Sequence, residues 1–364
     1  MANQVVFLVH GMGTFHDDWA LKTGEALRGY FNAYKLPKMF AAEKTFDFVS
    51  INYNDVFVGW QNSWKTDADA AAKQAGLDGM ESGLVEQLLK LAKAPTGDGF
   101  FQTHLLDVVL FYSFEFVSQA VQVRVAKQIV DRLMANGENN IPVWHVIAHS
   151  LGTAVIAETL HALFSHKLNG IHLGDAFKPQ CVAMVANTSR LLWNKGGEFD
   201  LSLMRPDGAS REGVCRCYLN FWHKLDPIPQ VKPFSQPPDH PPANWLDPLS
   251  KPSRVFVNPE PLPVDDLHSE NVHSLEHYLS HPSVHVPLIR QLLQNDDAIP
   301  PAEYKKALDK WRADSLKNQF LNDAKKKLND LASSANDPFA KALAKWIKYR
   351  TDIGRKYLAD GESE

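Results

Sequence analysis

The sequence predicts an α/β protein built on a mostly parallel central sheet with helices on both faces. Short, almost wholly apolar runs, such as residues 5–9 with their three valines, are typical of strands that are buried on both faces. Longer helical patterns separate these runs along the chain. The order of strand, helix and strand between residues 5 and 53 favours a right-handed parallel unit.

Strands and helices alternate in the first part of the predicted order, and three further strands follow. The pair Asn136-Gly137 closes one of the helices, because this dipeptide is a helix stop signal. Residues 149–152 form a sharp turn that joins a buried strand directly to a helix. In chain order we expect strand 5–9, helix 18–34, strand 46–53, helix 116–134, strand 143–148, helix 153–164, strand 180–186, strand 214–221 and strand 254–257.

Three segments depart from this alternation. Residues 60–100 are rich in alanine, glycine and charge, and we expect a helical insertion that is either a lid or a plain surface helix. Residues 227–263 are dense in proline, which fixes φ and lacks a ladder donor, so they predict a stiffened irregular loop. Residues 300–364 carry apolar stripes at helical spacing, which predict a C-terminal helical extension beyond a main domain of residues 1–299.

Composition argues against several classes of protein. The chain has 364 residues, 45% of them hydrophobic, and a formal charge of −4, so no strong field steers it to nucleic acid. Its three cysteines, Cys181, Cys215 and Cys217, do not make a disulfide framework and are expected to be buried thiols. No signal peptide or membrane-spanning window is evident, so we expect a cytoplasmic protein, with leaderless secretion left open.

The segment Ala148-His149-Ser150-Leu151-Gly152 carries the strongest chemical signal. A serine on a strained strand-to-helix turn needs very small residues two positions before and two positions after it, and Ala148 and Gly152 meet this need. The helix that follows brings N–H groups and its positive dipole end to the serine oxygen. Ser150 is therefore the predicted nucleophile, and the backbone N–H of Leu151 is a predicted oxyanion-hole donor.

A second glycine-lined turn, His10-Gly11-Met12-Gly13, follows the first strand directly. Acyl transfer needs two donors aimed at the developing oxyanion, and glycines let the backbone approach it closely. We assign the second oxyanion-hole donor to the N–H of Met12, with Gly13 as the alternative. An ordinary glycine turn between a strand and a helix is the other interpretation of this segment.

Residues 5–13 and 146–153 together resemble the α/β-hydrolase superfamily, and within it the bacterial serine esterases and lipases. The resemblance extends to about Ile289 and leaves residues 60–100 and the C-terminal extension unmatched. Ala148 departs from the first glycine of the family motif Gly-x-Ser-x-Gly. The resemblance implies an α/β-hydrolase fold in which residues 1–299 are the catalytic domain.

The chain order of the family, serine then acid then histidine, implies where the acid should lie. Asp226 is the expected acid, because it follows an apolar strand and precedes a proline. Asp200 and Asp207 are weaker alternatives, and Asp265 and Asp266 come late for this role.

The histidine is harder to assign, because five of them crowd residues 268–285. His273 is the expected catalytic histidine, since the run from Asn271 to Tyr278 resembles the loop-to-helix junction where many such esterases carry theirs; His277 is the main rival. Histidines spaced by four also suggest a metal site, but Pro282 interrupts the pattern. We therefore expect no metal and no other cofactor.

These residues predict a serine carboxylic-ester hydrolase, an esterase or lipase that works by acyl transfer through an acyl-enzyme. A phospholipase or thioesterase with the same three residues is the nearest alternative. A non-catalytic relative that serves as a binding or scaffold protein is the alternative from another class. The expected partner is a small-molecule or lipid ester, and contact with a membrane surface through the C-terminal helices stays open, as does the oligomeric state.

Overall fold

The computed structural model describes the parts of the chain that form the sheet, the helices around it and the loops at one end of the sheet. These are residues 4–11, 19–34, 36, 46–59, 111, 115–137, 140–165, 167–168, 170–171, 173–174, 177–190, 206, 213–230, 234, 256–257, 262–263, 267–269 and 272–315. The chain divides into two compact units, Met1–Val264 with Ser269–Leu308 and Asp265–His268 with Asp309–Glu364. The sheet belongs to the first unit.

Six strands in the described residues form a sheet of order β2-β1-β3-β4-β5-β6, and every pair of neighbours is parallel. Five of them have four to six residues, and a two-residue strand extends the edge. Their bounds are β1 Gln4–Val9, β2 Phe46–Ile51, β3 Trp144–His149, β4 Cys181–Val185, β5 Tyr218–Phe221 and β6 Phe256–Val257.

The order of the strands reverses at β1. The chain passes from β1 to β2 on one side and then returns to β3 on the other side, so β1 and β3 are neighbours whose connections leave in opposite directions. Clefts in open parallel sheets form at such a switch point, outside the carboxyl ends of the strands. Val9 lies opposite Ala148 in the register, so the segments that follow β1 and β3 come together there.

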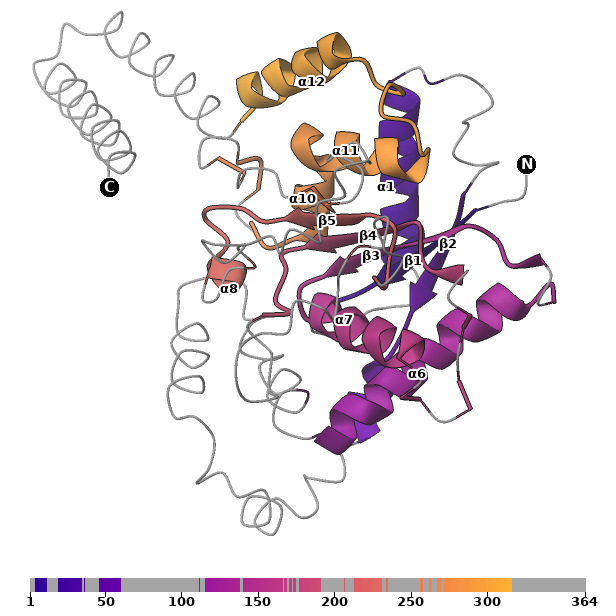
Figure 1. The fold of residues 1–364 in the computed structure, drawn as a ribbon. Coiled ribbons are helices and arrows are strands. Elements are labelled where there is room, and N and C mark those ends of the chain that lie inside the picture. The colour runs from indigo at the N-terminus through magenta and orange to yellow at the C-terminus, as the bar shows by residue number, and fades with distance from the viewer. Residues whose placement is uncertain are drawn as a thin grey trace, which may run out of the picture. The chain divides into compact units, whose positions relative to one another are not determined.

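Helices cover both faces of the sheet (Figure 1). Val5, Phe7 and Val9 of β1 face α6 (Glu115–Met134) and α7 (Leu151–Phe164). The intervening Val6 and Leu8 face α1 (Trp19–Ala33) and α11 (Pro282–Leu292). Because strand side chains alternate between faces, the apolar run 5–9 needs apolar partners on both sides.

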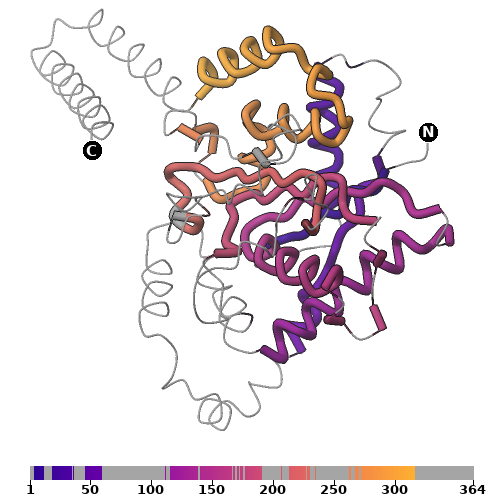
Figure 2. The backbone as a smooth tube through the Cα atoms, viewed as in Figure 1, coloured from indigo at the N-terminus to yellow at the C-terminus, as the bar shows by residue number. Residues whose placement is uncertain are grey.

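Segments far apart in the sequence meet on the second face. Figure 2 shows the indigo α1 beside the orange segment that contains α10 (Leu275–Ser280) and α11, and the three helices are in contact. A short helix α8 (Pro227–Gln230) follows β5, and α12 (Pro301–Ala313) follows α11. The contacts of α10 and α11 thereby hold the loop before α10 near the carboxyl ends of the strands.

The predicted parallel sheet with helices around it is confirmed. The structure trims or extends several elements: β5 begins at Tyr218, β6 keeps two residues, and α7 begins at Leu151. All three cysteines are buried, as expected. The predicted insertion at 60–100 lies outside the described residues, as do most of the proline-rich loop at 227–263 and the chain beyond residue 315.

The first part of the predicted C-terminal extension is helical, as α12 over Pro301–Ala313, and the rest of the extension lies outside the described residues. Its predicted apolar stripe, Tyr304, Leu308 and Trp311, is half-buried, and no residue of α12 is fully buried. The stripe therefore lies on the more protected side of the helix, where Tyr304 packs against the core that contains α11.

Candidate active site

Ser150 occupies a strained turn between β3 and α7. Its backbone has φ 53° and ψ −127°, a conformation that residues other than glycine rarely adopt. The turn places the serine at the start of α7, where the first N–H groups of a helix have no partners within the helix. The N–H of Leu151, the first residue of α7, belongs to this set.

Two threonines hold the strained turn in place. Thr153 Oγ1 donates to the Ser150 carbonyl oxygen at 2.6 Å, and Thr188 Oγ1 donates to the same oxygen at 2.9 Å. Thr153 Oγ1 in turn accepts from the Thr188 N–H at 2.9 Å. All three residues are buried, and the Ser150 carbonyl oxygen also accepts from the Thr153 N–H at 2.9 Å, so the turn is tied to the start of α7 by bonds shielded from water.

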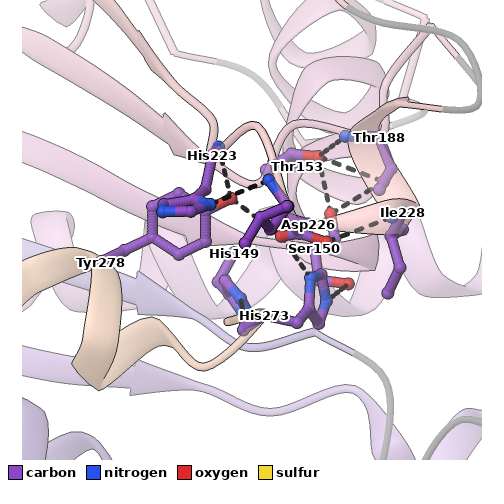
Figure 3. Close-up of polar contacts among 10 residues, drawn as sticks. His149, Ser150, Thr153, Thr188, His223, Asp226, Ile228, His273 and Tyr278 are labelled. Carbon is purple, nitrogen blue, oxygen red and sulfur yellow. Dashed lines mark hydrogen bonds and ion pairs between the residues drawn. The ribbon is translucent and has the colours of Figure 1, made fainter. Parts of the chain in front are cut away.

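The side chains of Ser150, His273 and Asp226 form one hydrogen-bonded chain (Figure 3). His273 Nε2 lies 2.8 Å from Ser150 Oγ, and His273 Nδ1 lies 2.8 Å from Asp226 Oδ2. An ionised carboxylate only accepts, so the proton of the neutral imidazole is on Nδ1. Nε2 is therefore free to accept the hydroxyl proton of Ser150.

Asp226 is fully buried yet held in its charged form. Its Oδ2 accepts from His273 and from the Tyr278 hydroxyl at 2.8 Å, and its Oδ1 accepts from the Ile228 N–H at 3.1 Å. Burial by itself raises the pKa of a carboxyl group. The charge interaction with His273 and the three hydrogen bonds outweigh burial, so the pKa of Asp226 lies below its ordinary value.

Tyr278 connects α10 to the loop that carries Asp226. Its hydroxyl accepts from the His223 N–H at 2.9 Å, so its own proton is directed to Asp226. Burial and the neighbouring Asp226 charge raise the pKa of Tyr278 well above its ordinary value. Tyr278 thus remains a donor to the charged Asp226 at neutral pH.

Two glycines permit β1 and its following loop to approach the serine. A methyl group on Gly11 would lie 2.8 Å from Ser150 Cβ, and one on Gly152 would lie 2.2 Å from the His10 carbonyl oxygen. Side chains at these positions would push the two turns apart. Tyr53 fixes the loop from the other side, because its hydroxyl lies 2.6 Å from the His10 carbonyl oxygen and 3.2 Å from that of Gly11.

Of the five predicted site residues, three are joined by hydrogen bonds in the structure, and a fourth lies next to them. Ser150, Asp226 and His273 form the chain of hydrogen bonds, and Leu151 begins the helix next to the serine. Met12, the predicted second oxyanion donor, lies outside the described residues.

The alternatives raised for the acid and the histidine have different outcomes. His277 is buried in α10 with its ring centroid 5.8 Å from that of His223, whereas His273 is the histidine that contacts Ser150. The four rival aspartates, Asp200, Asp207, Asp265 and Asp266, lie outside the described residues.

The residues that support Ser150, His273 and Asp226 were not predicted from the sequence. Tyr278 lies five positions after His273, within α10, and no spacing rule connects a turn residue to a helix residue at that distance. His149 was visible within the serine motif, but nothing in its position revealed what its ring contacts. Thr188 follows β4, and only the parallel register brings it to the serine turn.

No protein-family model matches the chain, and neither the curated proteins nor the solved structures contain a significant match to it. Within the described residues, no helix is both long and apolar enough to cross a membrane. In the same part of the chain, no three His, Cys, Asp or Glu side chains are grouped so as to hold a metal ion.

Proposed function

We propose that this protein is a serine hydrolase of the α/β-hydrolase type that cleaves carboxylic esters. The observation that carries the proposal is the hydrogen-bonded chain from Ser150 through His273 to Asp226, which begins at a strained turn between a parallel strand and a helix. The order of the three residues along the chain is the one that the family uses.

The arrangement includes a nucleophile, a general base and an acid in the positions that acyl transfer needs. His273 Nε2 takes the proton of Ser150 as its oxygen attacks the ester carbonyl carbon, and the carbonyl oxygen becomes an oxyanion. The protonated His273 then gives that proton to the leaving alcohol. Water, deprotonated by the same nitrogen, attacks the acyl-enzyme carbonyl. His273 then returns that proton to Ser150 Oγ as its bond to the acyl carbon breaks, which releases the acid.

The buried Asp226 has two effects in this sequence. It fixes His273 in the tautomer that leaves Nε2 unprotonated, and its negative charge stabilises the imidazolium that forms in both steps. The N–H of Leu151 is proposed as one oxyanion donor, with Met12 proposed as the second. Removal of one such donor costs on the order of 100-fold in rate in enzymes of this kind.

The class of ester is the open part of the proposal, and thioesters or phospholipid acyl bonds suit the same three residues. We would measure hydrolysis of p-nitrophenyl esters from acetate to palmitate with the wild type and with Ser150→Ala. Loss of turnover by a factor on the order of 10⁴ or more is expected for the variant. The chain-length optimum separates an esterase from a lipase.

The control is Ser189→Ala, which removes a buried serine hydroxyl near the same strand ends without touching the hydrogen-bonded chain. It should keep wild-type turnover. A folded wild type that hydrolyses none of the esters and is not labelled by a fluorophosphonate probe would contradict the proposal. That result would favour a binding or scaffold protein instead.

A further inference from the structure

We infer that His149 is a positioning residue, which holds the main chain of His273 so that the imidazole of His273 stays within reach of Ser150. The inference rests on the proposed function, because it assigns His149 a part in the reaction of those two residues. His149 does not contact the reacting atoms itself.

The contact between the two histidines is specific in its atoms. His149 Nε2 lies 2.7 Å from the carbonyl oxygen of His273, and the two rings lie 4.8 Å apart at an interplanar angle of 43° (Figure 3). A carbonyl only accepts, so Nε2 of His149 carries the proton and donates it. The side chain of one residue is thus bonded to the backbone of the other.

This bond matters because His273 lies in a turn just before α10, outside the ladder of the sheet. Its ring is oriented by Asp226 and Ser150, but hydrogen bonds to the ring do not fix the distance of its backbone from β3. His149 supplies that second point of attachment. A side chain held at both backbone and ring samples fewer orientations than one held at the ring alone.

The place of His149 in the chain makes the attachment effective. His149 is the last residue of β3 and is covalently joined to Ser150. The residue that carries the proposed nucleophile and the residue that holds the proposed base are therefore neighbours in one rigid strand end. A shift of the loop relative to β3 must break the bond to His149 before it can separate the His273 ring from Ser150.

The environment of His149 keeps it neutral. Burial, and after it the nearby positive charge of His273 when protonated, lower the pKa of His149 to about 3. A neutral His149 does not repel the imidazolium that His273 becomes during the reaction. The residue as a whole is only 8% exposed, so the bond to the carbonyl is also shielded from water.

The test compares two variants of nearly equal length, His149→Gln and His149→Met, with a hydrolysable p-nitrophenyl ester. Gln places an amide N–H near the position of the histidine Nε2–H, whereas Met fills the same space without a donor. We expect His149→Met to lower kcat by about 10- to 100-fold with KM within about twofold of wild type. His149→Gln should recover kcat to within about fivefold of wild type.

The chain offers a matched control in His145, a second buried histidine on β3. Its Nε2 bonds Gln4 Oε1 at 2.6 Å, away from the serine turn. His145→Met removes a buried imidazole from the same strand and should leave kcat unchanged. If His149→Met and His145→Met show the same kcat, or if Gln and Met at position 149 lower kcat equally, the positioning role is wrong.

A measurement on the unaltered protein covers the case in which the Met variant does not fold. Proton NMR of the wild type should show a His149 Nε2–H resonance that exchanges slowly with solvent and disappears in His149→Gln. A rapidly exchanging or missing resonance would overturn the inference. Absence of ester turnover and of fluorophosphonate labelling in the wild type would instead overturn the proposed function, and the positioning role with it.

Discussion

Four buried histidines predict that the protein loses stability steeply on mild acidification. The pKa of His10 and that of His285 are lowered to about 4, and those of His145 and His149 to about 3, in each case chiefly by burial. In the unfolded chain a histidine has a pKa of about 6.5. Between these values the unfolded state binds protons that the folded state does not.

The sign and the size of the effect follow from that difference. Because the unfolded state binds more protons, the free energy of unfolding falls as the pH falls, by about 1.4 kcal/mol per pH unit and per histidine. At pH 5, about 1.5 units below the unfolded pKa, each histidine costs about 2 kcal/mol. Four of them cost about 8 kcal/mol, which is comparable to the whole stability of an ordinary domain.

Urea unfolding followed by circular dichroism at pH 7.5 and at pH 5.0 measures this loss directly. His145→Gln serves as the matched variant, because His145 lies away from the proposed active site and its Nδ1 has no hydrogen-bond partner within the described residues. We expect the difference between the two pH values to shrink by about 2 kcal/mol in this variant. A wild type whose free energy of unfolding changes by less than 1 kcal/mol across the interval would refute the reasoning.

Two further variants test the geometry around Ser150. Gly11→Ala puts a methyl group 2.8 Å from Ser150 Cβ and should lower ester turnover about 100-fold. The control is Gly29→Ala, where nothing lies within 4 Å of the added methyl group, and it should keep full activity. Equal kcat values in the two variants would contradict the close approach of Gly11 to Ser150. Tyr278→Phe removes a donor that lowers the pKa of Asp226, so that pKa should rise, and the weaker hold on Asp226 should lower kcat for ester hydrolysis about 10-fold. An unchanged kcat would show that the hydroxyl is dispensable.

Much of the sheet could be predicted because its strands are short apolar runs with clear ends. Residues 5–9 are buried on both faces, and the helices after β1 and β3 begin within two residues of their expected positions. Strand β5 was expected to begin at residue 214 and begins at Tyr218. Apolar character alone does not distinguish a ladder residue from the buried loop residues Val214 and Cys215 that precede it.

The three central site residues could be proposed from sequence because each lies at a recognisable junction. Ser150 has small neighbours at a strand-to-helix turn, Asp226 follows a strand, and His273 precedes a helix. The residues that hold them in place, Thr188, His149 and Tyr278, could not be proposed from sequence. They act through contacts that only the strand register and the packing of α10 determine. Long-range contacts of this kind leave no local pattern in a single sequence.

The wide separation of Ser150, Asp226 and His273 along the chain has a consequence for biosynthesis. His273 meets Ser150 across 123 residues and Asp226 across 47, so the groups are assembled only after β4, β5 and the loop before α10 have been made and docked. Closing such long loops carries an entropic cost that a partly synthesised chain has not yet met. A ribosome-bound chain that stops short of His273 carries Ser150 as an ordinary alcohol, so the proposed nucleophile would arise only in the finished fold.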